Sequence, residues 1–65
     1  MKKRSITLKG HRTSVTLEAE FWTALESIAT ARKTSIQKLV ETIDASRGDN
    51  NLSSALRVFI LRNKA

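Results

Sequence analysis

Apolar and polar residues alternate over positions 12–17 of the chain. A period of two is typical of a β-strand with one dry face and one wet face. Every side chain on the wet face can form hydrogen bonds, so the strand is suited to a DNA major groove. There, Arg can donate two hydrogen bonds to guanine, and hydroxyls can donate to or accept from any base edge. The alternative is an ordinary half-exposed strand, since Thr and Val are common strand formers. The dry positions are Thr13, Val15 and Leu17, and the wet positions are Arg12, Ser14 and Thr16.

The same alternation covers Ser5 to Lys9, directly before Gly10 and His11. A glycine that opens a two-residue loop predicts a hairpin with a positive φ at the first central residue of its turn. Residues 1–4 would then form a mobile arm. The alternative is that the whole first run is an arm, which becomes ordered only on DNA or against a partner. The predicted cross-strand pairs are Leu8 with Thr13, Ile6 with Val15, and Lys9 with Arg12, the last being two like charges.

Apolar residues spaced three and four apart predict helices behind the strand. The first helix covers residues 18–32, with acids at its start and cations at its end, as the helix dipole favours. The second covers residues 35–45 and has Ser35 as its N-cap. Trp22 lies on the apolar stripe and is interpreted as a core or dimer anchor. The stripes consist of Phe21, Trp22, Leu25, Ile28 and Ala29 in the first helix, and of Ile36, Leu39, Val40 and Ile43 in the second.

A third helix, predicted over residues 52–63 with Asn51 or Ser53 as its cap, is apolar around most of its circumference. This is more apolar surface than a small monomer can bury, so we interpret the excess as subunit contact. A helix lying on a membrane surface is the alternative, but Arg57 and Arg62 do not form the broad cationic face that such a helix needs.

The chain has 65 residues, a size at which a single small domain rarely gains much stability without a disulfide or a bound metal ion. It has no cysteine and a single histidine, so neither a disulfide, a metal site nor a cofactor is expected. Apolar residues make up 40% of the chain and proline is absent, which indicates a folded protein. We therefore expect an obligate homodimer in which a second copy completes the core.

The formal net charge is +6, and the positive charge is concentrated at the N-terminal end. Residues 1–17 contain no acid, whereas all six acids lie within residues 18–51. A basic end joined to a strand with a polar face favours a polyanionic partner, double-stranded DNA. The alternative is a tail that only aids solubility. The cations of residues 1–17 are Lys2, Lys3, Arg4, Lys9 and Arg12.

Membrane insertion and catalysis are both disfavoured. No apolar run approaches the roughly 20 residues of a membrane span, and no cleavage signal follows the basic N-terminus, so a cytoplasmic protein without a membrane partner is expected. An enzyme needs a nucleophile or an acid–base pair held in a cleft. His11 stands alone beside a glycine and the carboxylates are scattered, so we do not expect an enzyme.

A strand, a helix directly behind it, a tight turn and a second helix capped by Ser35 follow one another over residues 12–45. In this order and spacing the chain resembles the ribbon-helix-helix repressors. With Leu-Lys-Gly-His-Arg-Thr-Ser near the start and Asn-Leu-Ser-Ser-Ala-Leu-Arg-Val-Phe near the end, the whole chain is similar to short bacterial ribbon-helix-helix domain proteins. The resemblance implies a mainly α fold with an N-terminal β-ribbon. It further implies an intertwined homodimer, to which this chain adds a C-terminal helix, and a single domain in which residues 1–11 form a basic arm or hairpin strand.

The resemblance also assigns roles to particular residues. Two chains would pair their ribbons antiparallel, and the two-stranded sheet would enter the major groove. The base readers would be Arg12, Ser14 and Thr16. Phosphate contacts would come from Ser35 with the backbone amides of Ile36 and Gln37, and from Lys2, Lys3, Arg4 and Lys9. The dimer core would be Val15, Leu17, Trp22, Leu25, Ile28, Leu39, Ile43, Leu56 and Phe59.

The sequence departs from the family pattern in three ways. Its strand carries one long outward cation and two hydroxyls where members of the family often carry several long polar side chains. Glu18 stands where proline is common, and a third apolar helix follows. The first departure weakens base discrimination, because hydroxyls distinguish bases poorly.

The sequence therefore predicts a homodimeric DNA-binding transcriptional regulator, a repressor that acts by occupying its operator. The alternative is a protein-interaction module, antitoxin-like or an adaptor, that binds a protein partner through the apolar C-terminal helix. DNA binding weakens steeply with added salt, whereas docking of an apolar helix does not, so salt dependence separates the two. A further hypothesis is a helix-turn-helix protein whose helix at Leu52 binds DNA. The sequence supports it less well, because that helix is almost wholly apolar.

Overall fold

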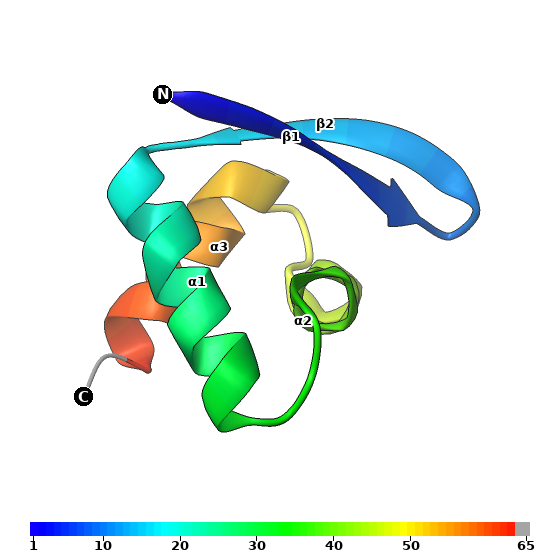
Figure 1. The fold of residues 1–65 in the computed structure, drawn as a ribbon. Coiled ribbons are helices and arrows are strands. Elements are labelled where there is room, and N and C mark those ends of the chain that lie inside the picture. The colour runs from blue at the N-terminus through cyan, green and yellow to red at the C-terminus, as the bar shows by residue number, and fades with distance from the viewer. Residues whose placement is uncertain (64–65) are drawn as a thin grey trace.

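The computed structural model describes residues 1–63. An antiparallel hairpin is followed by three helices, and the hairpin lies across one side of the helical layer (Figure 1). This is the predicted class, mainly α with an N-terminal β-ribbon. The elements are β1 (Lys2–Leu8), β2 (His11–Leu17), α1 (Ala19–Ala31), α2 (Ile36–Ser46) and α3 (Leu52–Arg62).

The mobile arm predicted for residues 1–4 is wrong, because β1 begins at Lys2. Trp22 of α1 anchors this end of the strand: its Nε1 donates a hydrogen bond to the Lys2 carbonyl oxygen at 2.9 Å. The Arg4 guanidinium lies over the same indole, 4.8 Å from the ring centroid, and is 2.8 Å from a carboxylate oxygen of Glu26. Of the two alternatives left open by the sequence, the first run is thus a hairpin strand.

The turn of the hairpin consists of Lys9 and Gly10, not Gly10 and His11 as predicted. Both central residues have positive φ, 51° and 80°. Such a turn matches the right-handed twist of the flanking strands. The register is therefore two residues away from the predicted one, and it moves Lys9 out of its unfavourable position opposite Arg12. The observed pairs include Leu8 with His11, Thr7 with Arg12, Ile6 with Thr13, and Arg4 with Val15.

The apolar face of the hairpin covers one core shared with all three helices. The structure buries Leu17, Leu25, Val40 and Leu56 completely, and Trp22 is 2% exposed. Of the side chains expected in a dimer core, seven are buried within a single chain, and Ile28 and Phe59 are partly buried against them. The seven are Val15, Leu17, Trp22, Leu25, Leu39, Ile43 and Leu56.

Side-chain caps fix the start of the second and third helices. Ser35 Oγ accepts a hydrogen bond from the Lys38 N–H at 3.1 Å, and Asn51 Oδ1 accepts one from the Ser54 N–H at 2.8 Å. Such a bond satisfies an N–H that has no acceptor within the helix. The predicted Ser35 cap is thus confirmed, and Asn51 rather than Ser53 caps α3. Ser53 Oγ instead donates to the Thr16 carbonyl at 3.3 Å, which ties α3 to β2.

Candidate nucleic-acid interface

The outward face of the hairpin carries only side chains that form hydrogen bonds. Directly opposite residues of an antiparallel pair point to the same face of the sheet. Five of the six outward residues are exposed and the sixth, Thr16, is half-buried. The face holds two cations, four hydroxyls and no acid, so it offers donors and acceptors together with positive charge. Its cross-strand pairs are Lys3 with Thr16, Ser5 with Ser14, and Thr7 with Arg12.

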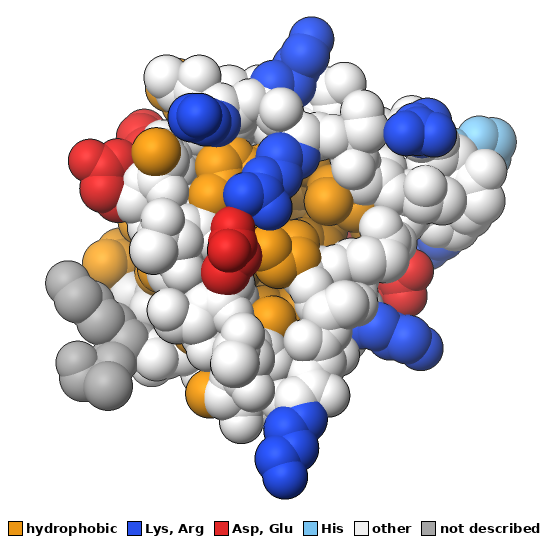
Figure 2. Space-filling model, viewed as in Figure 1, with side chains coloured by type: hydrophobic (Ala, Val, Ile, Leu, Met, Phe, Trp, Pro, Cys, Tyr) orange, Lys and Arg blue, Asp and Glu red, His pale blue; other side chains and the backbone are white. Residues whose placement is uncertain are grey.

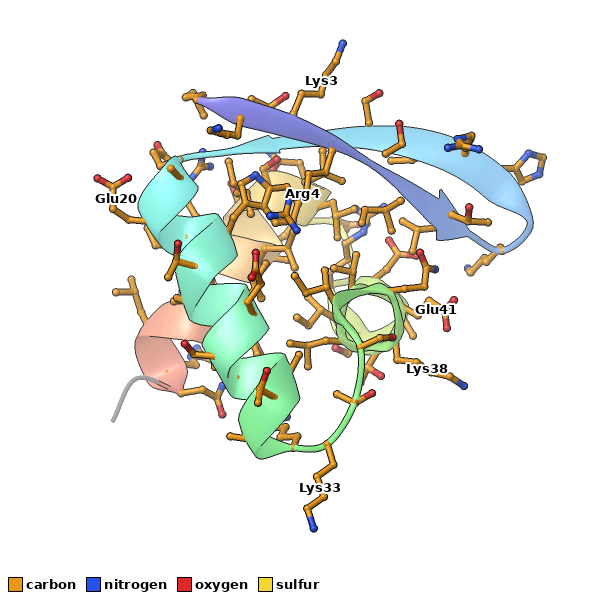
Figure 3. The ribbon with its side chains drawn as sticks, in the orientation of Figure 1. Lys3, Arg4, Glu20, Lys33, Lys38 and Glu41 are labelled. Carbon is orange, nitrogen blue, oxygen red and sulfur yellow. The ribbon has the colours of Figure 1, made fainter. Side chains whose placement is uncertain are left out.

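Neighbouring cations of β1 lie on opposite sides of the sheet. Figure 3 shows Lys3 pointing away from the helices and Arg4 pointing towards them. Because the Arg4 guanidinium pairs with Glu26 and lies over Trp22, the structure does not bring it together with the outward face. Lys2 and Lys9 lie at the two ends of the hairpin and are exposed.

The acids lie outside the hairpin, because residues 1–17 contain no Asp or Glu. In the view of Figure 2, basic side chains lie along the hairpin and also over the helices, whereas the acidic side chains lie over the helices. An anionic ligand that approaches the outward face therefore meets cations and hydroxyls without a nearby carboxylate on the same face.

The start of α2 lies beside the outer edge of β1. Gln37 hydrogen-bonds the backbone of Thr7, its Oε1 accepting from the Thr7 N–H at 3.2 Å and its Nε2 donating to the Thr7 carbonyl. The first N–H groups of a helix have no acceptor within the helix, so those of Ile36 and Gln37 can hold an anion there. The contact with Thr7 places these amides and Ser35 close to the hairpin.

A model of the ribbon-helix-helix domain family matches residues 1–63 of the chain. The protein belongs to the ribbon-helix-helix family. Proteins of this family are generally DNA-binding transcription regulators that form dimers, and they are typically not enzymes. No curated protein and no solved structure gave a significant match.

This ribbon-helix-helix protein forms its two-stranded ribbon within one chain. The pairing of ribbons between two chains, which the resemblance implies, stays a prediction. Within the chain, β1 pairs with β2 and supplies the second strand. As a result, Ser5 and Thr7 join the outward face, two residues that the sequence reasoning did not select. The alternation over residues 5–9 carried this signal, because it puts both residues on the polar side of the first strand.

In the ribbon-helix-helix protein an ion pair holds the junction between ribbon and helices. Glu18, the residue between β2 and α1, lies 3.1 Å from Arg57 of α3. A hydrogen bond from its own backbone N–H and the contact with Arg57 outweigh partial desolvation and hold the pKa of Glu18 below its ordinary value of 4.5. Glu18, found where proline is common in the family, thus fixes the end of the ribbon against α3.

Among the residues that the structure describes, no helix is both long enough and apolar enough to cross a lipid bilayer.

Proposed function

We propose that this protein is a transcriptional repressor that reads DNA by laying the outward face of its hairpin in the major groove. The supporting observation is a two-stranded sheet whose outward face is polar, exposed and free of acids. The major groove is about 12 Å wide and admits a two-stranded β-ribbon. The family assignment supports the same role, because ribbon-helix-helix domains are generally DNA-binding regulators.

Arg12 is the strongest candidate for base recognition. Its guanidinium can donate two parallel hydrogen bonds to the O6 and N7 atoms of guanine. Ser14 and Thr16, together with Ser5 and Thr7 from the first strand, present hydroxyls that bond several bases. We therefore propose that the sequence preference centres on the bases that Arg12 contacts.

Contacts with the phosphate backbone supply affinity that does not depend on sequence. Lys2, Lys3 and Lys9 are exposed along the hairpin, so their ammonium groups can reach phosphates at the edges of the groove. The start of α2 at Ser35, with the amides of residues 36–37, is proposed to bind a further phosphate beside β1. Arg4 is left out of this set because its guanidinium is paired with Glu26.

We propose that the regulator acts as a homodimer with two separate ribbons. If two hairpins joined edge to edge, the outer strands of the resulting four-stranded sheet would be about 14 Å apart, at about 4.8 Å per strand spacing. A sheet of that width does not fit a major groove of about 12 Å. Each copy would therefore use its own hairpin, and the operator would contain two half-sites that follow the symmetry of the dimer.

A second candidate function is protein binding through α3. Val58 and Leu61 are 43% and 66% exposed, although both are large apolar side chains. A protein partner that covers them would bind with little dependence on salt, since burial of apolar surface dominates such an interface. The two functions are thus separated by the same titration that tests DNA binding.

The test is fluorescence anisotropy with a pool of short random duplexes at two ionic strengths, compared between two matched variants. Thr7→Glu adds a carboxylate to the outward face, and Thr30→Glu adds one to an exposed position of α1. Wild-type binding should fall steeply with salt, Thr7→Glu should weaken it at least tenfold, and Thr30→Glu should leave it near the wild-type value. Equal behaviour of the two variants would contradict the proposed use of the hairpin.

A further inference from the structure

Within residues 1–63, the half of β2 that carries Arg12 and Ser14 has no hydrogen bond to the helices. The hydrogen bond that does join β2 to a helix runs from Ser53 to the Thr16 carbonyl, at the other end of the strand. In Figure 1 the hairpin continues past the helices to its turn. Arg12 lies two positions after Gly10 of that turn, and its side chain is exposed. The position of this part of β2 therefore depends on the strand beside it.

β1 supports this part of β2 through Thr7, the cross-strand partner of Arg12. Leu8 and His11 flank the turn, and the two residues that flank such a turn are joined by backbone hydrogen bonds. Hydrogen-bonded and non-hydrogen-bonded pairs alternate along an antiparallel ladder, so Thr7 and Arg12 form a pair of the second kind, whose side chains lie closer together. The N–H and carbonyl groups of Thr7 consequently point to the outer edge of β1.

Gln37 of α2 binds both of these groups of Thr7. Its Oε1 accepts from the Thr7 N–H at 3.2 Å, and its Nε2 donates to the Thr7 carbonyl. Nε2 also donates to a carboxylate oxygen of Glu41, four positions further along α2, at 2.7 Å. An amide turned over would place its oxygen against the Thr7 carbonyl and the Glu41 carboxylate, which are both acceptors. Glu41 therefore fixes the direction of the amide, and Thr7 is held at two points.

We infer that Gln37 is a positioning residue for base recognition, which holds Thr7 and thereby sets where Arg12 presents its guanidinium. The inference rests on the proposed function, because it assigns Gln37 a role in the reading of DNA by the outward face. A guanidinium must meet two acceptors of one guanine at once, so a small displacement of the strand breaks one of the two hydrogen bonds.

Contacts with phosphate are less sensitive to such a displacement. A lysine ammonium group is a compact charge on a flexible stem, so it can follow a phosphate when the strand moves. The backbone N–H groups at the start of α2 are kept whatever the side chain at position 37. Loss of the Gln37 side chain therefore lowers discrimination between sequences more than it lowers affinity for DNA in general.

The test measures the dissociation constant for a scrambled duplex divided by that for a preferred duplex selected with the wild type. Gln37→Ala should lower this ratio about fivefold, through partial loss of the bidentate contact. Asn63→Ala is the matched control, since the Asn63 amide also makes two hydrogen bonds, with Arg32 and the Phe59 carbonyl. It lies at the end of α3 away from the hairpin (Figure 1) and should leave the ratio near the wild-type value. Circular dichroism checks that both variants are folded.

A double variant tests whether Gln37 acts through Arg12. In an Arg12→Ala background, Gln37→Ala should leave the ratio unchanged, because the group that it positions is absent. A general structural role would instead lower the ratio by the same factor in both backgrounds. Effects that multiply in the double variant would therefore overturn the inference.

Nitrogen-15 relaxation of the free protein tests the attachment without DNA. Gln37→Ala should lower the heteronuclear NOE of the Arg12 amide, whereas Asn63→Ala should not change it. An unchanged NOE in Gln37→Ala would contradict the attachment itself.

The outcomes separate the inference from the proposed function. Sequence preference that is lost in Arg12→Ala but kept in Gln37→Ala would overturn the inference and leave the proposed function standing. A wild type without any preference would contradict the proposed reading of bases and the role of Gln37 in it together, even if the Arg12 amide responded to Gln37→Ala in the relaxation data.

Discussion

The side-chain amide of Gln37 hydrogen-bonds both backbone groups of Thr7, its Oε1 accepting from the N–H at 3.2 Å and its Nε2 donating to the carbonyl oxygen. These groups of Thr7 face the outer edge of β1, where unpaired backbone can template another strand. One side chain thus covers part of the edge and holds the start of α2 beside the ribbon. The position of the proposed phosphate contact at Ser35 depends on this attachment.

Gln37→Ala should lower the free energy of unfolding by about 1 kcal/mol, the usual net value of a partly exposed hydrogen bond. It should also speed hydrogen exchange of the Thr7 amide, because that N–H loses its acceptor. Urea unfolding and amide exchange measured by NMR give the two values. Lys38→Ala is the control: the side chain at position 38 is exposed, and the backbone bond from residue 38 to Ser35 is retained. If both variants exchanged alike at Thr7, the attachment would be absent in solution.

Much of the fold could be predicted from local pattern. The three helices begin and end within a residue or two of their predicted bounds, because apolar spacing and capping residues act within a few positions. The hairpin register could not be predicted in the same way. A shift of two residues keeps Ile6, Leu8, Thr13 and Val15 on one face, so the apolar pattern is satisfied equally by the predicted and the observed register. The turn geometry decides between them.

Contacts between distant parts of the chain also escaped prediction. The basic run 2–4 predicts a phosphate contact for Arg4, but in β1 this residue pairs with Val15 on the inward face, where its guanidinium meets Glu26 of α1. The expected dimer core is largely buried in one chain because β1 and α3 cover it. The alternation of residues alone predicts the polar face of β2. The part of this face that β1 contributes also depends on how β1 pairs with β2, which the alternation does not determine.

The turn residues Lys9 and Gly10 offer a test of the observed register. Gly10 has φ 80° and nothing within 4 Å of a Cβ added there. Gly10→Ala should therefore lower the free energy of unfolding by about 1–2 kcal/mol through backbone strain alone.

Lys9→Asn should stabilise the protein by up to about 1 kcal/mol, because asparagine tolerates a positive φ and Asn-Gly favours this turn. Thermal and urea unfolding measure both changes.

The predicted turn at Gly10 and His11 would respond differently. There the positive φ falls on the first central residue only, and Lys9 would be an ordinary strand position where asparagine is unfavourable. A destabilising effect of Lys9→Asn would thus contradict the observed register. Lys3→Asn, at a strand position of β1, is the matched control and should destabilise slightly.

The ion pair between Glu18 and Arg57 should make stability depend on pH. The pKa of Glu18 is lower in the folded protein than its ordinary value of 4.5, so the unfolded chain binds the proton more readily. The stabilisation is therefore fully present above the unfolded pKa and is lost as the pH falls through 4.5 and then through the lower folded pKa. Glu18→Gln removes this contribution, so the variant should be less stable than wild type at neutral pH and equally stable in acid.

Urea unfolding of wild type and Glu18→Gln from pH 7 downwards measures this convergence, because midpoints compared at equal slope report differences in stability. Asp49→Asn, in the loop between α2 and α3, is the control because it removes an exposed carboxylate that forms no ion pair within residues 1–63. Its difference from wild type should stay nearly constant over the same range. A constant difference for Glu18→Gln as well would show that the pair contributes nothing.

Arg12 and Lys3 lie on the same outward face but should contribute to DNA binding in different ways. Arg12→Ala should weaken binding to the preferred sequence by about 1–3 kcal/mol and broaden the range of sequences bound. Lys3→Ala should weaken binding to all sequences alike and lower the salt slope by about one unit per chain. Selection from a random duplex pool, followed by salt titration on the selected sequence, measures both properties.

Arg62→Ala is the matched control for charge. Arg62 is an exposed residue at the C-terminal end of α3, and this end lies on the side of the helical layer away from the hairpin (Figure 1), so its loss lowers the net charge equally outside the proposed interface. Its effect on the salt slope should be close to zero. Equal loss of sequence preference in Arg12→Ala and Lys3→Ala would mean that the face contacts only phosphates. Equal slopes for Lys3→Ala and Arg62→Ala would place the DNA elsewhere, because net charge alone would then explain the binding.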